Sequence, residues 1–323
     1  MKQLLGASAL VVVLTNLLAA CSSDTSAPGD GGPVPSAADG ETPAVIPVAR
    51  GEGDDDDDML LSPEPVVGDR VVGSAFAATL ADILDEELQS GLGWRPNDLF
   101  LIGPGWWTDN VNNTQLGKLE VVRQTCRILK TRIARVDDSS AFDARIEKAE
   151  SAFFNDATRY MLPSAEKKYR EGVAAIRGYA EGLTDDTSLF QARSNNLYDL
   201  LGYYKDVLGS CHSTLVRRHE PDGSRVSTFK ADDYFHYAAG VADAIGRMGR
   251  AIEVDFHEEL ASRNLLDLND QALVSLERGA SLEPCVVTEG DADGVLANHR
   301  LNLSGYVADA RQKLHSVRET LKK

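Results

Sequence analysis

One nineteen-residue stretch carries the clearest periodic pattern in the chain: Leu197-Tyr-Asp-Leu-Leu-Gly-Tyr-Tyr-Lys-Asp-Val-Leu-Gly-Ser-Cys-His-Ser-Thr-Leu215. Its apolar residues recur at alternating steps of four and three positions, at Leu197, Leu201, Tyr204, Leu208, Cys211 and Leu215. With about 3.6 residues per turn, such residues share one face of an α-helix. The pattern predicts a long helix over residues 187–218, and its seven-residue repeat favours knobs-into-holes packing against other helices.

The same helical spacing recurs elsewhere. The C-terminal segment repeats it at Leu303, Val307, Ala310, Leu314, Val317 and Leu321. Residues 114–135 carry an apolar stripe of Leu116, Leu119, Val122, Cys126, Leu129 and Ile133. Residues 231–263 carry one of Phe235, Ala238, Ala242, Ile245, Met248, Ile252 and Phe256. This last segment also contains Gly240, Gly246 and Gly249, which lower helix propensity and so indicate close approach of a neighbouring helix.

Start and stop signals complete the expected architecture. Further helices are expected at residues 74–89, at 140–155, from Ser164, from just after Asn269, and after a loop at 284–294. Only residues 285–288 suggest an extended segment. We therefore expect an all-α protein: an elongated multi-helix bundle of about eight helices with little or no β-structure, in a single domain over residues 69–323.

The first twenty residues follow the plan of an export signal. Lys2 precedes an apolar stretch that ends in Leu17-Leu-Ala-Ala-Cys21, which resembles the bacterial lipobox. The alternative is a membrane-spanning helix, but residues 4–20 supply only seventeen residues, two of them polar, where about 20 are needed. We therefore expect residues 1–20 to be a signal peptide and Cys21 to be lipidated. By resemblance to the sorting of enterobacterial lipoproteins, Ser22 after the cysteine favours the outer membrane over the inner one.

Residues 21–68 have the composition of a disordered tether. They contain seven of the twelve prolines and the acidic run Asp54–Asp58, and such a segment cannot bury enough apolar surface to offset the entropy of ordering it. Calcium binding by the acidic run is the alternative. Adjacent carboxylates lack the spaced ligands and the turn glycine of a calcium loop, so we expect a solvated spacer.

Net charge is unevenly distributed along the chain. Residues 21–69 hold twelve acidic residues and one arginine, and so contribute −11 to the total of −17. Residues 70–323 contribute −7, with Lys2 adding the remaining positive charge. Neither part offers the basic stripe that binding to a phosphate backbone requires, so nucleic acid is not an expected partner.

Three cysteines follow Cys21 in the sequence: Cys126, Cys211 and Cys285. An oxidising compartment permits a disulfide, and three thiols allow one at most within a monomer. Their spacing does not match a zinc site. We expect small buried residues, and the sequence leaves open whether any two of them pair.

Several short motifs occur in a familiar order: Gly93-Leu-Gly-Trp-Arg-Pro-Asn-Asp98, Trp106-Trp-Thr-Asp-Asn110, Gln115-Leu-Gly117, Val121-Val-Arg123, Leu162-Pro-Ser-Ala-Glu166, Asp232-Asp233, Ala251-Ile-Glu-Val-Asp-Phe256 and Ala297-Asn-His299. Through them the chain resembles the bacterial domain of unknown function 2333 family over residues 70–320. The resemblance implies an envelope protein with a mostly helical body that faces the periplasm. It implies no activity. Family members usually begin with a membrane helix, where this chain has the lipobox and the acidic segment.

Glu253 and His257 are four residues apart on one expected helix, a spacing at which a carboxylate and an imidazole can share a metal ion. The segment lacks the second histidine of a zincin, and no expected helix carries the Glu-x-x-His pattern of di-iron bundles. We therefore predict a solvated or salt-bridged helix face here, with no metal and no cofactor.

Polar residues gather at the expected helix entrances: Asn97, Asp98, Asp109, Asn110, Asn113, Asn298 and His299. Such residues cap exposed backbone N–H groups, a role that suits Asn113 and Asn298. The alternative is a ligand-binding cleft at one end of the bundle, lined by these loops together with Trp94, Trp106, Trp107 and Asn298. Aromatic faces beside Asp and Asn side chains suit sugars or peptides.

Two functions therefore remain open. The first is a lipid-anchored helical scaffold or binding protein of the cell envelope, whose partners are the membrane and an envelope protein or cell-wall component. The second is an envelope hydrolase or lyase acting on glycan or peptide, with Asp98, Asp109 and His299 as catalytic residues and the histidine as general base. The sequence has no signature of a serine or cysteine hydrolase, which favours the first function.

Overall fold

The computed structural model describes residues 71–91, 93–96, 109–136, 140–159, 163–284, 286–288, 290 and 297–322. All of them belong to one compact unit, Pro65–Lys323. The expected signal peptide, the expected lipidation site Cys21 and the acidic segment lie outside the described residues.

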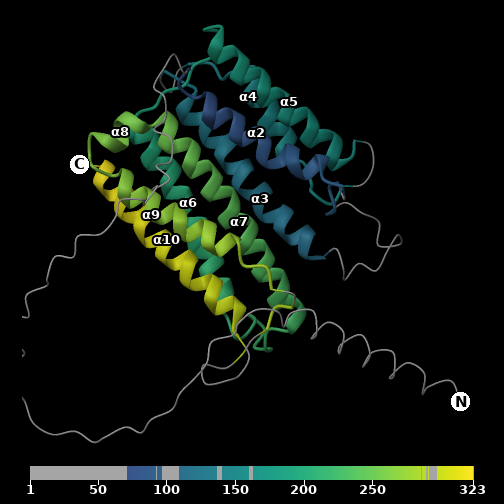
Figure 1. Cartoon of the computed structure of the whole chain (residues 1–323). Helices are drawn as coiled ribbons and strands as arrows, with labels where there is room; N and C mark the ends of the chain where they lie inside the picture. Colours follow the sequence, from purple (N-terminus) through teal and green to yellow (C-terminus); the bar gives the residue numbers. More distant parts are fainter. Residues whose placement is uncertain are drawn as a thin grey trace, which may run out of the picture. The chain divides into compact units, whose positions relative to one another are not determined.

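Every regular element among the described residues is helical, which confirms the predicted all-α class (Figure 1). The elements are α2 (Ser74–Gln89), α3 (Asp109–Ile128), the π-helix η2 (Leu129–Ile133), α4 (Ala144–Phe153), α5 (Ala165–Thr184), α6 (Ser194–Leu215), α7 (Thr228–Asp255), α8 (His257–Ala261), α9 (Leu266–Ala280) and α10 (His299–Leu321). Residues 286–288, part of the segment that suggested an extended strand, do not form one.

Helix α7 lies at the centre of the bundle and packs against α2, α3, α6, α9 and α10 (Figure 1). Helices α2 and α3 pack on one side of α7, and α5 covers α2 while pairing with α4. Helices α6 and α9 also pack against α7, and α10 joins α6 to α9. The central helix therefore holds two groups of helices together.

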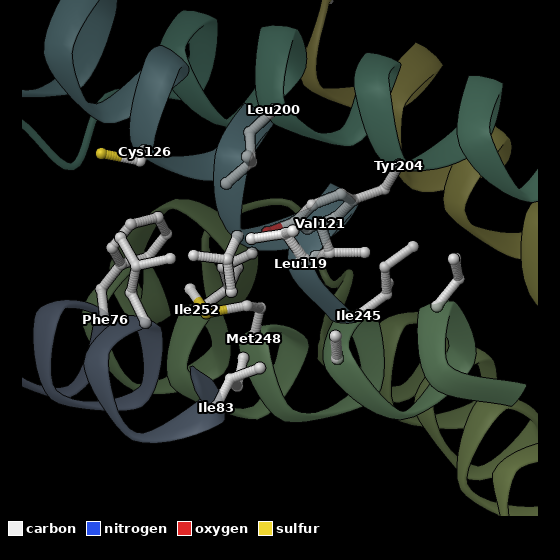
Figure 2. Packing of buried hydrophobic residues seen from close by; sticks show 14 of the residues in the cluster. Phe76, Ile83, Leu119, Val121, Cys126, Leu200, Tyr204, Ile245, Met248 and Ile252 are labelled. Atoms are coloured by element: carbon white, nitrogen blue, oxygen red, sulfur yellow. The ribbon is translucent and has the colours of Figure 1, made fainter. Parts of the chain in front are cut away.

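The two predicted heptad faces form much of the core. The six apolar residues predicted to face inward in α6 are at most 3% exposed, and those of α10 at most 5%. Figure 2 shows side chains of several helices meeting in this core, among them Ile83, Leu119, Leu200, Tyr204, Ile245 and Met248. Because each fully buried Leu or Val side chain contributes about 1.5–3 kcal/mol, these two faces contribute substantially to stability.

Helices α3 and α7 meet in backbone contact at two glycines. A Cβ atom on Gly240 would lie 2.1 Å from the carbonyl oxygen of Thr114, and one on Gly117 would lie 2.2 Å from that of Tyr237. No side chain fits at either position, so the two helices approach as closely as their backbones allow. The predicted close approach at Gly240 is confirmed.

The other two glycines of α7 face α9 and differ from each other. A Cβ atom on Gly249 would lie 2.2 Å from Leu273 Cδ2, which again indicates close approach. At Gly246 the nearest neighbour would be Leu276 Cβ at 3.7 Å, an ordinary van der Waals contact. Close approach therefore explains Gly249 but not Gly246.

Helix α3 begins five residues earlier than the predicted start at Thr114 and ends in the π-helical turn η2. Asn113 consequently lies inside the helix, and its predicted capping role is wrong: its side chain donates to Asp233 Oδ1 at 2.8 Å. At the other end, the carbonyl of Ile133 accepts a hydrogen bond from Gln191 N at 2.9 Å. This contact with a distant segment accompanies the departure from α-helical geometry.

Helix α6 starts at Ser194, seven residues after the predicted start at residue 187. The preceding residues make tertiary contacts instead of helical turns. The ring of Phe190 packs 5.4 Å from that of Phe76 and 5.5 Å from that of Phe256, centroid to centroid. Helical propensity in this segment is overridden by the aromatic cluster.

The helix predicted over residues 231–263 is divided into α7 and α8 at Phe256, whose backbone leaves the helical region at φ −109° and ψ 21°. Just before the break, the buried Asp255 accepts a hydrogen bond from the backbone N–H of Phe76, with 2.7 Å between N and Oδ2. Helix α2 follows Gly73, which has no side chain to cap it. Asp255 therefore supplies from α7 the cap that α2 lacks locally.

Candidate functional site

A cleft of about 490 Å³ with charged residues in its lining lies between α2, α3, α7 and the segment after α9. We call it the α3–α7 cleft. It is lined by Glu87, Asn110, Val111, Thr114, Lys118, His236, Ala239, Asp243, Ala280, Leu282, Glu283 and Pro284. Helices α2, α3 and α7, which supply most of these residues, lie side by side (Figure 1).

Lys118 is held between two carboxylates at this cleft. Its Nζ lies 2.8 Å from Glu87 Oε1 and 2.9 Å from Asp243 Oδ2. The Lys118 and Glu87 side chains are 14% and 17% exposed, and that of Asp243 is 34% exposed. Burial lowers the pKa of Lys118, but the charge of Asp243 and the hydrogen bond with Glu87 raise it overall above its ordinary value. The lysine is therefore protonated at physiological pH and joins α2, α3 and α7.

Gln115 fixes the loop that follows α2 beside the cleft. Its side chain is fully buried, and its Oε1 accepts from Arg95 N at 2.9 Å. Its Nε2 donates to the carbonyl of Gly93 at 3.0 Å and to Glu87 Oε2 at 3.1 Å. One amide thus satisfies two backbone groups of the loop and one carboxylate of the cleft.

The N-terminal half of α7 contributes His236 to the cleft and carries two aspartates about one turn earlier. Asp233 accepts the hydrogen bond from Asn113 of α3. His236 Nε2 lies 3.7 Å from Asp232 Oδ1, one turn earlier on the same helix. The two aspartates form one of the short motifs on which the family resemblance rests, and Asp233 lies where α3 meets α7.

Trp94, predicted to line a ligand cleft, is 2% exposed. Its Nε1–H donates to the carbonyl of Ala157 at 3.0 Å, and its ring packs edge-on against Tyr169 with the centroids 4.9 Å apart. The aromatic body is in the core and the polar edge is satisfied, as expected of a buried tryptophan. In this structure the side chain contributes to packing.

Asn298 and His299 organise the start of α10. Asn298 is its N-cap: its side chain accepts from Leu301 N at 3.0 Å and donates to the carbonyl of Gly290 at 2.9 Å. His299 Nδ1 lies 3.1 Å from the backbone nitrogen of Thr288, which donates to it. The predicted capping role of Asn298 is confirmed, and the histidine is bound to the loop before its helix.

The remaining predicted site residues cannot be placed. Asp98, Trp106, Trp107 and Cys21 lie outside the described residues, and Asp109 begins α3 with its side chain outside them. Convergence of the three proposed catalytic side chains therefore stays a prediction.

Sequence reasoning missed Lys118, Glu87 and Asp243. A lysine and two carboxylates on separate helices carry no spacing signal, because their meeting depends on how the helices rotate and align. Gln115 did carry a signal, since it begins the Gln115-Leu-Gly117 motif.

Glu253, considered as a metal ligand, belongs to an ion-pair network. Its carboxylate accepts from Arg250 and Asn269, each at 3.1 Å. Arg250 also bonds Asp270 at 2.6 Å and Glu277 at 2.8 Å. The predicted salt-bridged helix face is thus confirmed. Within the described part of the chain, no three His, Cys, Asp or Glu side chains group to hold a metal ion.

Cys126 and Cys211 are buried free thiols, so they do not form a disulfide with each other. Burial raises the pKa of the Cys126 thiol, and it raises that of Cys211 to about 12. Neither thiol is a nucleophile near neutral pH. Cys285 lies outside the described residues.

Fold and cleft together define an all-α helical-bundle protein with a charged interhelical cleft. Among the described residues, no helix is long and apolar enough to cross a membrane. The chain belongs to the DUF2333 family, described as uncharacterized proteins conserved in bacteria, whose model matches residues 59–221 and 216–323. Neither a curated protein nor a solved structure matches the chain.

Proposed function

We propose that the chain is a lipid-anchored binding protein of the bacterial cell envelope. Cys21 would carry the lipid, and the α3–α7 cleft would take up a cationic group of an envelope protein or cell-wall component. The lipobox-like end of the export signal supports the anchor. Such export puts the body of the protein on the periplasmic side of the membrane, which is the oxidising side.

The charge of the α3–α7 cleft carries the binding part of this proposal. Glu87, Asp243 and Glu283 line it together with a single lysine, Lys118, so negative charge is in excess. Asp243 is the most exposed member of the ion-paired group, at 34%, and a second cation can approach it from solvent. An acidic concavity attracts and orients an amine or guanidinium group.

The anchor is tested by replacing the acceptor cysteine. Cys21→Ala in the full chain is expected to abolish labelling by a fatty-acid probe in growing cells and to leave an unprocessed precursor. Labelling that persists in this variant would refute lipidation at Cys21.

The cleft is tested with a photocrosslinking amino acid in intact envelopes. We expect an adduct from position 111, which lines the cleft, and none from the exposed position 136. Asp243→Asn removes one negative charge and keeps an acceptor for Lys118, so the adduct should weaken while the fold is retained. Adducts of equal yield at both positions, or an adduct unaffected by Asp243→Asn, would argue against a cationic partner in the cleft.

A further inference from the structure

The connection between α6 and α7 forms an ordered hairpin, which we call the α6–α7 tip (residues 216–230). The backbone N–H of Val226 donates to the carbonyl of Arg218 at 3.2 Å, and that of Glu220 donates to the carbonyl of Ser224 at 2.8 Å. Ser227 caps α7 by accepting a hydrogen bond from Lys230 N through its side chain. The tip is therefore a fixed surface feature at the end of two long helices.

A buried acid holds the tip together from beneath. Glu220 is 9% exposed and accepts a hydrogen bond from Tyr234 Oη at 2.8 Å. Its carboxylate also lies 3.7 Å from Arg217 and 3.7 Å from Lys230. The negative charge of Glu220 thus faces inward, whereas the basic side chains extend towards solvent.

Phe229, at the second position of α7, is 81% exposed, the highest value of any large apolar side chain described. The two other exposed phenylalanines are covered by cations. Phe142 lies 4.6 Å from Lys130 Nζ, ring centroid to nitrogen, and Phe154 lies 4.2 Å from the guanidinium of Arg127. No ring or cation contact to Phe229 is formed within the described residues. Its aromatic ring is exposed to solvent, with no such contact in the part of the chain that the structure describes.

The charge of the tip is opposite to that of the chain. It carries Arg217, Arg218, Arg225 and Lys230 against two acids, one of them the buried Glu220, in a protein of net charge −17. The first turn of α7 contains no acidic residue. The positive end of the α7 dipole therefore adds to the basic side chains at this surface.

We propose that the α6–α7 tip docks on an anionic phospholipid surface. Phe229 enters the boundary between headgroups and acyl chains, and Arg218, Arg225 and Lys230 face the lipid phosphates. A protruding aromatic ring surrounded by basic side chains has both the apolar and the charge complementarity that such a surface offers. This contact goes beyond the proposed anchor and does not depend on a lipid at Cys21.

The test places a fluorophore at the tip of the full chain. Phe229→Trp is titrated with phosphatidylglycerol vesicles whose acyl chains are brominated, and the emission of the parent chain is subtracted. We expect a blue shift and strong quenching, both at least several-fold weaker with phosphatidylcholine vesicles. Phe142→Trp is the matched control, because it too is an exposed phenylalanine with basic neighbours, and it should show neither change.

A second variant tests the charges. Arg218→Glu combined with Arg225→Glu in the Phe229→Trp chain should abolish the quenching while the melting temperature stays unchanged. Quenching equal to that of the Phe142→Trp control, or equal with neutral vesicles, would overturn the proposal. So would a blue shift that grows with protein concentration in the absence of lipid, which would make the tip an interface between copies. Repeating the titration with Cys21→Ser separates docking from anchoring, since the tip signal should persist.

Discussion

The contact between α3 and α7 makes a quantitative prediction for Gly240→Ala. The added Cβ would lie 2.1 Å from the carbonyl oxygen of Thr114, and 2.9 Å from its carbonyl carbon. These are backbone atoms of a packed helix, so no side-chain rotation can relieve the overlap, and the two helices must separate. Gly246→Ala on the same helix is the control, since its Cβ would meet Leu276 Cβ at an ordinary 3.7 Å.

Two opposing contributions set the change in the free energy of unfolding. Overpacking costs about 1–3 kcal/mol, and we take the upper value because backbone has to move. Alanine gains about 1 kcal/mol over glycine in helix propensity, and both variants share this gain. Gly240→Ala should therefore lower the free energy of unfolding by about 2 kcal/mol, while Gly246→Ala should raise it by up to about 1 kcal/mol.

Urea and thermal unfolding followed by circular dichroism measure both variants. For a domain of this size about 1 kcal/mol corresponds to a shift of about 2–4 °C in melting temperature. We expect a fall of about 4–8 °C for Gly240→Ala and a rise of at most about 2–4 °C for Gly246→Ala. Shifts of the same sign and similar size in the two variants would refute the backbone contact.

Three further predictions concern single side chains. Asp255→Ala removes the cap of α2 at Phe76 N and should cost about 1–3 kcal/mol in urea unfolding, while Asp255→Asn, which keeps an acceptor, should cost clearly less. Burial alone would raise the pKa of Asp143. Hydrogen bonds from Arg145, donated by its side chain and by its backbone N–H, lower the pKa overall. The charged Asp143 therefore stabilises the fold above its ordinary pKa of 3.8, and this stabilisation is lost as the pH falls below that value. Asp143→Asn should flatten the acid side of a plot of unfolding free energy against pH. Parallel plots for the variant and the parent chain would contradict this. Cys126 and Cys211 should resist alkylation at pH 8 in the native protein and react in denaturant, as mass spectrometry would show; rapid native labelling of either would contradict their burial.

The fold could be predicted because burial in a helical bundle imposes its period on the sequence. The residues spaced from Leu197 to Leu215 are buried in α6, and those from Leu303 to Leu321 are buried in α10. Helix ends were less predictable, since they depend on distant residues. Asp255 caps α2 and Phe190 fills an aromatic cluster, and neither role is visible in local sequence.

The candidate site was predictable only where a residue acts on its own neighbours. Asn298 caps α10 by bonding to the backbone three residues later, and local sequence is sufficient to predict that. Lys118 acts across three helices, and its partners were not identified because charged residues on helix surfaces all look alike in sequence. Which of them become buried depends on helix rotation and register.

The glycine contact and the charged cleft are parts of one arrangement. Gly117 directly precedes Lys118 on α3, and Gly240 lies three residues before Asp243 on α7. The backbone contact at the glycines brings the two helices close enough for the lysine to reach the aspartate at 2.9 Å. An alanine at position 240 should therefore lengthen this ion pair as it separates the helices. It follows that Gly240→Ala should weaken capture of a cleft partner even at temperatures where the protein remains folded, whereas Gly246→Ala should leave it unchanged.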